Sequence, residues 1–388
     1  MNPPADELLD RVRARLAAEA AEPTAEMIAA AIRAESAGML GDTELLAALR
    51  YLQTELTGAG KLEPLLAEPD IADILVTGPD QVWVDRGEGL HRTTITFADE
   101  ASVRRLATRL ALSAGRRLDD AQPWVDGQLS GVGRRGYTVR LHALIPPLSA
   151  DGTCISLRVL RSAGKDLDDL IASGTIPSSV VPVIADILRA RLAFLIIGGT
   201  GSGKTTLLNA LIGAMDPAER VLCVEDALEL SPRHPQVVRL VARAANVEGV
   251  GEVTVRTLVR QSLRMRPDRI IVGEVRGGEV IDLLTALNTG HDGSAGTVHA
   301  NSTAEVPARM EALAALGGMN REALHSQLAA ALQVVLGVAR GTDGCRALSE
   351  IGMVCRGADG LVHIVPIWLR ASGFTDEAAS FAELVASR

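Results

Sequence analysis

The pattern of apolar positions predicts helices first and a small sheet after them. From residue 5 to about residue 56, apolar residues recur at helical spacing, with breaks at Pro23 and Gly38. The opposite face of these helices is mixed in charge rather than cationic, which favours packing against another helix over insertion into a bilayer. Short apolar runs around a glycine-rich turn then predict three strands, at residues 74–76, 81–85 and 93–97.

Two further runs, residues 137–145 and 155–159, alternate strictly between apolar and polar residues. Arg140 lies on the polar face of the first run and Arg158 on the polar face of the second. If the runs pair, both guanidinium groups project from one side of one sheet and can grip phosphate oxygens. Two solvated strand arginines are an equally weighted alternative.

Residues 161–179 are polar and contain Gly, Ser and Pro, which indicates a linker between two domains. After the linker, apolar strands at residues 192–197, 220–224 and 269–272 alternate with helical patterns, one of them at residues 253–265. This order is typical of a parallel sheet with crossover helices. In such a sheet the carboxyl ends of the strands share one edge, where ligands bind.

A phosphate-binding motif follows the first of these strands directly. The residues after Gly198 are Gly199, Thr200, Gly201, Ser202, Gly203, Lys204, Thr205 and Thr206. The glycines let the backbone fold around an anion, and the helix that follows presents its N-terminal N–H groups to that anion. The motif therefore predicts ATP binding, with Lys204 on the β- and γ-phosphates and Thr205 on Mg²⁺.

Two carboxylates stand at the ends of the other strands, Glu225 and Glu274. Because those strand ends share an edge with the phosphate loop, we expect all three to converge. Transfer of the γ-phosphoryl group to water needs a metal clamp and a group that orients the water. Thr205 with Glu274 is the predicted metal site, and Glu225 is the predicted base, although the sequence would also allow the two glutamates to exchange roles.

A glycine-rich stretch at residues 287–301 contains His291 and His299. These histidines could sense the γ-phosphate or relay domain motion, whereas structural histidines are the alternative. A metal site formed by the two is disfavoured, since no third ligand follows at a useful spacing.

Composition limits the partners. The 388 residues carry a formal net charge of −9, which disfavours direct binding to nucleic acid. Four scattered cysteines without a C-x-x-C pair indicate neither a zinc cluster nor a disulfide framework, so the cytosol is the expected compartment. The polar N-terminus does not resemble a signal peptide, and no apolar run reaches the length of a membrane span. Membrane association is therefore expected through a partner.

Four ordered motifs resemble those of the secretion ATPase superfamily: the phosphate loop, the acidic stretch at residues 224–230, the stretch at residues 264–276 and the histidine stretch. Residues 73–78, 83–87 and 116–119 are most similar to the tight-adherence (Flp) pilus ATPases, which are relatives of the conjugal-transfer ATPases.

The resemblance implies an α/β fold, with a RecA-like P-loop ATPase domain at residues 163–388. It implies a smaller α/β (α+β) nucleotide-sensing domain at residues 56–162 and a helical segment at residues 1–55. A cytoplasmic homohexameric ring would dock on an inner-membrane platform protein, and ATP hydrolysis would drive pilin assembly or export. Arg140 and Arg158 match the nucleotide contacts of the N-terminal domain, Glu225 the acidic box, Glu274 the Walker B position, and His291 and His299 the histidine box.

A DNA-translocating conjugation motor and a noncatalytic ATP-binding scaffold are the alternative functions. The acidic balance counts against the first, and the presence of Lys204, Glu225 and Glu274 counts against the second. The arginine that would act across a subunit boundary stays open. The candidates are Arg256, Arg260, Arg264 and Arg276.

Overall fold

The computed structural model divides into two compact units, Met1–Leu160 and Arg161–Arg388, each of which is described by itself. It describes residues 11–12, 15, 25–36, 41, 58–87, 89–132, 137–160, 164–246, 248–341 and 344–388. Most of the predicted helical segment at residues 1–55 lies outside the described residues; within it, helix α2 spans Ala25–Glu35. Among the described helices, none combines the length and apolar character that crossing a bilayer requires.

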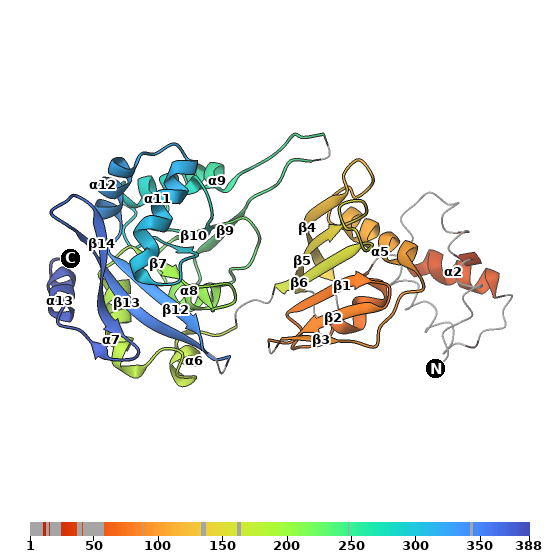
Figure 1. Ribbon diagram of the computed structural model, residues 1–388, viewed down its shortest axis with the longest axis horizontal. Coiled ribbons are helices and arrows are strands. Elements are labelled where there is room, and N and C mark those ends of the chain that lie inside the picture. Colours follow the sequence, from red (N-terminus) through yellow and green to blue (C-terminus); the bar gives the residue numbers. More distant parts are fainter. Residues whose placement is uncertain are drawn as a thin grey trace. The chain divides into compact units, whose positions relative to one another are not determined.

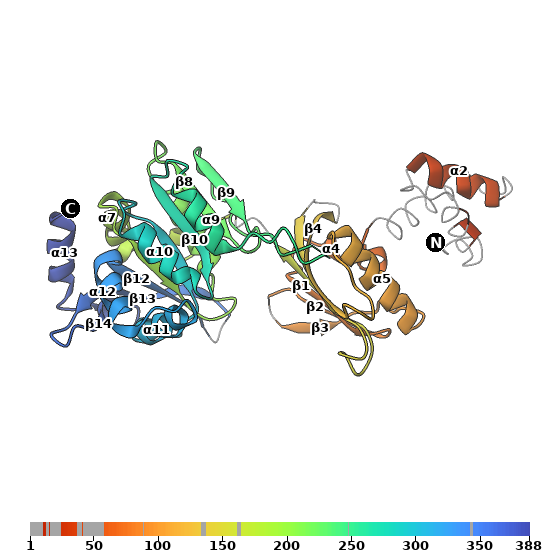
Figure 2. The ribbon, with the colours of Figure 1, turned by 90° about the horizontal axis from the view of Figure 1, so that it is seen from above.

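The first unit contains a six-stranded antiparallel sheet with the order β3-β2-β1-β6-β5-β4 (Figure 1; Figure 2 shows it from above). Its strands are β1 (Asp73–Gly78), β2 (Gln81–Asp85), β3 (Leu90–Arg92), β4 (Trp124–Val132), β5 (Tyr137–Leu144) and β6 (Cys154–Leu160). The predicted pairing of the two alternating runs is confirmed, because Arg140 lies opposite Arg158 in the β5–β6 register. The predicted strand at residues 93–97 is wrong, since β3 begins directly after the turn and ends at Arg92.

One face of this sheet is apolar and covered by helices. Helix α5 (Glu100–Ser113) begins at Asp99, whose carboxylate accepts a hydrogen bond from the Ser102 N–H at 2.7 Å. Its residues Val103, Leu106 and Leu110 pack in the same cluster as the inward-facing residues of β5 and β6. The shorter η1 (Gly60–Leu62) and α4 (Glu63–Leu66) add Leu62, Leu65 and Leu66 to that cluster. The other face carries the polar residues of the strands.

The second unit contains a nine-stranded mixed sheet with the order β15-β14-β13-β12-β7-β11-β10-β8-β9 (Figure 1). The strands from β12 to β9 in this order are parallel, and the other three are added antiparallel. The strands are β7 (Phe194–Ile197), β8 (Val221–Glu225), β9 (Val237–Val241), β10 (Arg269–Val275), β11 (Ala295–Val298), β12 (Val334–Arg340), β13 (Arg346–Arg356), β14 (Val362–Leu369) and β15 (Gly373–Phe374).

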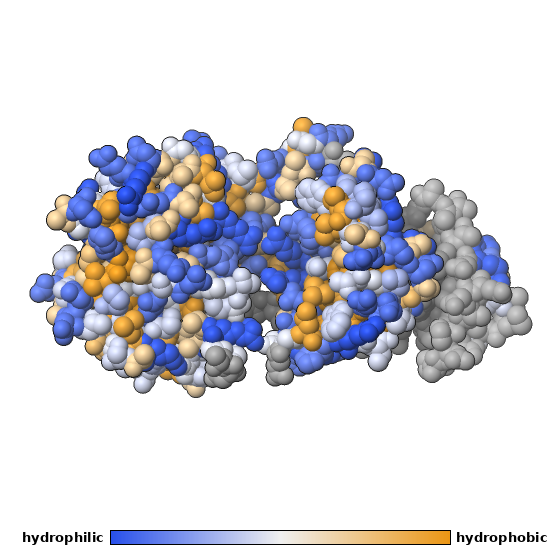
Figure 3. Space-filling view, in the orientation of Figure 1, coloured by the Kyte–Doolittle hydropathy of each residue, from blue (hydrophilic) through white to orange (hydrophobic). Residues whose placement is uncertain are grey.

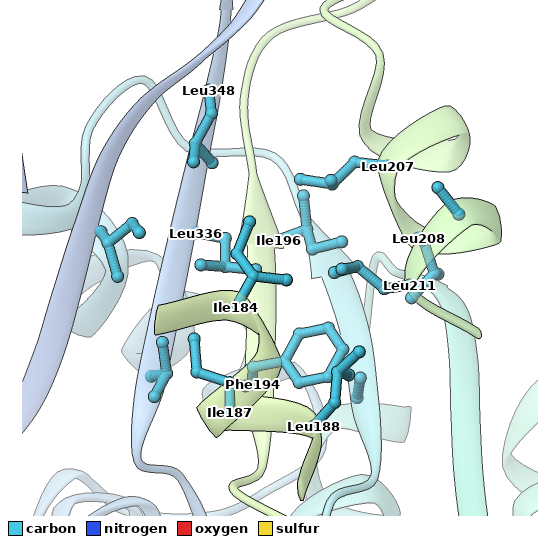
Figure 4. Close-up of a cluster of buried hydrophobic side chains, with 14 of the residues drawn as sticks. Ile184, Ile187, Leu188, Phe194, Ile196, Leu207, Leu208, Leu211, Leu336 and Leu348 are labelled. Carbon is cyan, nitrogen blue, oxygen red and sulfur yellow. The ribbon is translucent and has the colours of Figure 1, made fainter. Parts of the chain in front are cut away.

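Helices cover both faces of this sheet. They are α6 (Leu167–Ala172), η2 (Ser178–Val180), α7 (Val181–Arg189), α8 (Lys204–Gly213), α9 (Val255–Ser262), α10 (Glu279–Leu287), η3 (Thr303–Glu305), α11 (Val306–Leu316), α12 (Arg321–Ala331) and α13 (Ala378–Ala386). Phe194 and Ile196 pack with α7 and α8 on one face (Figure 4), whereas Leu195 and Ile197 pack with α9 to α12 on the other. Such an all-buried strand is typical of a parallel sheet covered on both sides.

The predicted order of strands and helices in this unit is confirmed for β7, α8, β8, α9 and β10. Because these strands run parallel, the loops after Ile197, Glu225 and Val298 leave the sheet at one edge. The apolar side chains lie mainly inside; on the face of this unit seen in Figure 3, hydrophilic residues are interspersed with smaller hydrophobic areas. The site described next lies at that shared edge.

Candidate nucleotide site

The phosphate loop connects the buried strand β7 to the N-terminus of α8. Gly203 adopts a left-handed conformation (φ 102°) directly before Lys204, the first residue of the helix. A side chain there would be strained, so the glycine lets the loop turn into the helix within one residue. The N-terminal N–H groups of α8 therefore face the loop, as an anion site requires.

Lys204 lies within the loop rather than extending into solvent. Its Nζ atom donates hydrogen bonds to the carbonyl oxygens of Gly198 and Gly199, at 2.8 and 2.9 Å. Burial of the ammonium group lowers the pKa of Lys204, although the nearby carboxylate of Glu274 opposes this shift. The cation is thus held at the place where phosphate oxygens would need it.

Lys204 begins a chain of polar contacts that crosses the sheet edge. Its Nζ atom lies 3.3 Å from Nδ1 of His299, and Nε2 of His299 lies 2.7 Å from Oε1 of Glu274. The other oxygen of Glu274 accepts a hydrogen bond from Arg276 at 2.5 Å, and Arg276 also pairs with Asp226 at 3.0 Å. Arg276 lowers the pKa of Glu274 against the opposing effect of burial, so this carboxylate is ionised.

Glu225 lies beneath this edge rather than on it. Its side chain is 3% exposed, and Oε2 accepts hydrogen bonds from the backbone N–H groups of Glu229 and Leu230, at 2.9 and 2.8 Å. Burial raises the pKa of Glu225 to about 7. A Cβ atom at Gly273 would lie 2.8 Å from Cγ of Glu225, so the glycine makes room for this side chain. Glu225 therefore shapes the loop that follows β8.

That loop brings forward a residue that the sequence analysis did not select. Thr205 Oγ1 donates to Oε2 of Glu229 at 3.4 Å. Burial, Asp226 and Glu274 raise the pKa of Glu229, because like charges gather around it. The acidic stretch at residues 224–230 contained the signal, but only its strand-end glutamate was selected.

The hydroxyl and carboxylate oxygens of this edge are suitable ligands for Mg²⁺. The candidate ligands are Thr205, Glu229 and Glu274, all oxygen donors of the type that this ion prefers. The raised pKa of Glu229 supports this choice, since a divalent cation would relieve the repulsion among the carboxylates. The predicted pair of Thr205 and Glu274 therefore gains Glu229 as a third candidate.

The remaining predicted loop residues occupy the turn between β7 and α8. Gly199, Thr200 and Gly201 are exposed, whereas Ser202 is 4% exposed and Thr206 lies in the first turn of α8. Within the described part of the chain, the Ser202 Oγ atom is buried without a hydrogen-bond partner. Such a hydroxyl is suited to a phosphate oxygen.

The two predicted histidines lie at opposite ends of β11. Ala295 at its start pairs with Phe194, and Val298 at its end pairs with Ile197, directly before the phosphate loop. His299 therefore lies at the nucleotide edge, whereas His291 lies before the strand, where its Nδ1 atom is 3.2 Å from the carbonyl of Ala286. The length of β11 therefore separates His291 from the phosphate loop of the same chain, and its contact with nucleotide stays a prediction.

Arg140 lies on β5 and Arg158 on β6, both in the first unit. Each is paired with a carboxylate: Arg140 Nη2 lies 2.9 Å from Asp126 Oδ2, and Arg158 Nε lies 2.8 Å from Asp73 Oδ1. Their common face is as predicted, and their contact with nucleotide stays a prediction. Arg256 and Arg260 both bind Asp282, at 2.6 and 2.7 Å.

Comparison with known proteins identifies the family. Residues 55–360 match the type II/IV secretion system protein family. The chain belongs to this family. A Mycobacterium tuberculosis protein whose name assigns it to conjugal transfer is 66% identical over 350 residues, which are 90% of this chain and 99% of that protein. Conjugal transfer protein TrbB of Rhizobium radiobacter is 32% identical over 307 residues, 78% of this chain and 89% of its own.

Two solved structures share the fold of this secretion ATPase family member. The pilus retraction motor PilT with bound ADP covers 84% of each chain with a TM-score of 0.53 and 20% identity. The Legionella pneumophila ATPase DotB covers 84% of this chain and 85% of its own, with a TM-score of 0.52 and 20% identity. The predicted fold class, a RecA-like P-loop domain with a smaller α/β domain, is thereby confirmed. The tight-adherence subgroup stays a prediction.

Proposed function

We propose that this family member is a Mg²⁺-dependent ATPase that hydrolyses ATP to ADP and phosphate. The observation that carries the proposal is the convergence of Lys204, His299, Glu274 and Glu229 on one phosphate loop. Phosphoryl transfer requires little covalent chemistry from the protein, but it does require positioned cations, a metal site and a carboxylate at the attacking water. All three requirements have candidates at this edge.

We propose separate roles for the carboxylates, supported by their different contacts. The loop N–H groups and Lys204 hold the phosphates. Glu229, beside the Thr205 hydroxyl, serves the metal side, where Mg²⁺ would neutralise charge on the β- and γ-phosphate oxygens. Glu274, linked to Lys204 through His299, faces the γ-phosphate side and orients the water. Glu225, buried and bonded to backbone N–H groups, holds the loop; the role of base predicted for it from the sequence is the alternative.

Four variants separate these roles. Lys204→Ala should abolish turnover, and Glu274→Gln should bind Mg-ATP but not hydrolyse it. Glu229→Gln should raise the Mg²⁺ concentration needed for half-maximal rate, because one oxygen ligand loses its charge. Hydrolysis retained in Glu225→Gln supports the assignment, whereas its complete loss with intact binding would restore Glu225 as the base. Phosphate release by the purified chain is the measurement.

We propose further that hydrolysis powers assembly of a tight-adherence or type IV-like pilus, or protein secretion, from the cytoplasmic face of the inner membrane. A homohexameric ring would act there on a membrane platform protein. The resemblance of residues 73–78, 83–87 and 116–119 to the Flp pilus ATPases supports this role. Vesicles that contain a polytopic platform protein from the same genome should stimulate hydrolysis several-fold, and light scattering with Mg-ATPγS should give the mass of six chains.

A conjugation-type DNA-transfer ATPase is the second candidate. The names of the Mycobacterium tuberculosis relative and of TrbB favour it, whereas the net charge of −9 does not. Single- or double-stranded DNA should stimulate hydrolysis if this candidate is correct. No response to DNA together with stimulation by the platform vesicles would support the pilus or secretion motor.

A further inference from the structure

The C-terminal hairpin of β12 and β13 packs against the phosphate loop. A Cβ atom at Gly198 would lie 2.3 Å from the carbonyl oxygen of Val338 on β12. A Cβ atom at Gly203 would lie 3.2 Å from Cδ of Arg346, the first residue of β13. Arg346 Nε also donates a hydrogen bond to the carbonyl oxygen of Gly201 at 2.8 Å. Two strands far from the motif in the sequence thus contact the loop at three of its glycines.

The peptide between Gly201 and Ser202 shows on which side of the loop Arg346 lies. In a trans peptide the C=O and the following N–H point in opposite directions. The Gly201 carbonyl points to Arg346, and the Ser202 N–H lies 3.4 Å from the Gly199 carbonyl, inside the loop. Arg346 therefore contacts one side of this peptide, and on the opposite side its N–H group makes a long hydrogen bond to the Gly199 carbonyl within the loop.

Among the described residues, Arg346 binds a backbone carbonyl, whereas Arg276 and Arg256 form ion pairs with carboxylates. Arg276 pairs with Glu274, and Arg256 pairs with Asp282. Within the residues that the structure describes, the Gly201 carbonyl is the polar group that the Arg346 side chain bonds. A cationic donor on a carbonyl polarises the whole peptide and makes its N–H a stronger donor.

The strand that carries Arg346 is itself anchored near the nucleotide edge. Both oxygens of Glu350 on β13 accept hydrogen bonds from Thr303, one from its N–H and one from its hydroxyl, each at 2.8 Å. Thr303 begins η3, four residues after His299. These two hydrogen bonds fix the position of β13 at the same edge. Arg346 therefore contacts the loop from a strand that is held in place.

We propose that Arg346 is a positioning residue of the phosphate loop, which holds the Gly201–Ser202 peptide so that its N–H group faces the bound phosphates. The inference rests on the proposed nucleotide binding and deepens it. The loop N–H groups cradle the α- and β-phosphates, which ADP and ATP share. A residue that shapes this cradle from outside strengthens the binding of both nucleotides equally, whereas a residue on the γ-phosphate distinguishes them.

The test measures the dissociation constants of Mg-ADP and Mg-ATPγS by calorimetry for the full chain and three variants. Arg346→Ala should raise both constants by the same factor, about tenfold, the effect expected from one lost charge-assisted hydrogen bond. Arg346→Lys should recover most of the affinity, since its ammonium can still donate to the Gly201 carbonyl. Arg356→Ala is the matched control, because Arg356 ends the same strand and makes the same kind of bond, from Nε to the Gly360 carbonyl at 3.2 Å.

Hydrogen exchange adds a readout of the loop itself. The amides of residues 201–206 should exchange faster in Arg346→Ala, with an unchanged thermal midpoint. Unchanged constants for both nucleotides would overturn the inference, and so would a loss confined to Mg-ATPγS, which would place Arg346 on the γ-phosphate instead. If the natural chain binds neither nucleotide, the proposed ATPase function fails, and the role of Arg346 fails with it.

Discussion

The ammonium group of Lys204 lies 3.3 Å from Nδ1 of His299. An ammonium group can only donate hydrogen bonds, so Nδ1 is the acceptor and the ring carries its proton on Nε2, which faces Glu274. Burial and the charge of Lys204 lower the pKa of His299, which keeps the ring neutral at pH 7. The neutral imidazole of His299 thus lies between the Lys204 ammonium group and the Glu274 carboxylate and contacts both.

Protonation of His299 is expected to reduce hydrolysis. A proton on Nδ1 would face the Lys204 ammonium, and the lowered pKa places this event below pH 6.5. His299→Gln keeps one acceptor and one donor but cannot titrate. The ratio of kcat between the natural chain and this variant should therefore fall about tenfold for each pH unit below the pKa of His299.

A control variant isolates this effect from other histidines. His363 is exposed, and its Nε2 atom lies 3.5 Å from Oδ2 of Asp359. Because this pair is not part of the nucleotide site, His363→Gln should leave the pH profile of kcat unchanged. If the ratio of kcat between the natural chain and His299→Gln stays constant from pH 7 to 5, protonation of His299 is not the cause of the loss of activity at low pH.

Glu225 should make the stability of the second unit depend on pH. Its pKa is about 7 in the folded chain, against 4.5 for an ordinary glutamate, so the folded chain retains a proton that the unfolded chain has released. The contribution of Glu225 to the free energy of unfolding should therefore be greatest below pH 4.5 and decrease as the pH rises through about 7. Glu225→Gln removes this titration, and its unfolding free energy relative to the natural chain should increase by about 3 kcal/mol across that window.

Urea unfolding at intervals between pH 4.5 and 8 measures this difference. Glu248→Gln, at an exposed position of the same unit, should show no such trend. A difference between Glu225→Gln and the natural chain that stays constant over the window would mean that Glu225 is ionised throughout.

Gly273 is expected to tolerate no side chain. A Cβ atom there would lie 2.8 Å from Cγ and 3.5 Å from Oε2 of Glu225, and Glu274 is the next residue. Gly273→Ala should therefore cost about 1 to 3 kcal/mol of unfolding free energy, the range for overpacking a closed site. It should also reduce kcat, since Glu274 moves with the displaced backbone. Calorimetric melting and phosphate release measure the two effects.

Gly78 at the end of β1 provides the comparison for this substitution. No atom lies within 4 Å of a Cβ atom placed there, so Gly78→Ala should leave hydrolysis and the melting temperature of the second unit unchanged. Equal behaviour of Gly273→Ala and Gly78→Ala would contradict the tight packing of Glu225 against β10.

The elements that the sequence predicted are those with a strong local signal. The phosphate loop, β7 and α8 follow from the glycine spacing and an apolar run. The hairpin of β2 and β3 was misplaced because its turn is closed by a side chain: Asp85 Oδ1 accepts hydrogen bonds from the N–H groups of Gly87 and Gly89. Strand β3 can therefore begin at Leu90.

The site was predicted less completely than the fold, because several of its contacts join distant segments. The predicted positions of Glu225 and Glu274 at strand ends are correct. However, the buried Glu225 side chain accepts hydrogen bonds from the backbone of the loop that follows it, and it is Glu229 that lies beside Thr205. His291 resembled His299 in the sequence, yet a four-residue strand separates them. Arg346 carried no local signal, since only the pairing of β12 with β7 brings its hairpin to the loop.

Arg269 and Glu219 form a buried ion pair at the start of β10, and its loss is expected to destabilise the second unit. Arg269 is 1% exposed, with Nε 2.5 Å and Nη2 3.1 Å from the two oxygens of Glu219. Glu219→Ala would leave a buried guanidinium group with only the backbone carbonyls of Leu188 and Gly293, at a cost of about 3 to 5 kcal/mol. Arg233→Ala, which breaks an exposed pair, should cost less than about 1 kcal/mol in the same urea titration.

Replacing both partners of the buried pair shows whether Glu219→Ala is unstable because a buried charge is unpaired or because side-chain packing is lost. With Arg269 and Glu219 both changed to Met, the buried guanidinium group is gone and only the partly exposed Arg191 loses its carboxylate, at 3.0 Å in the natural chain, so much of the loss in Glu219→Ala should be recovered. The dissociation constant of Mg-ADP should stay unchanged in both variants at low temperature, because Arg269 starts β10 and the phosphate loop lies at the other end of the sheet. Weaker nucleotide binding in the double variant would instead show that this pair also determines the geometry of the nucleotide edge.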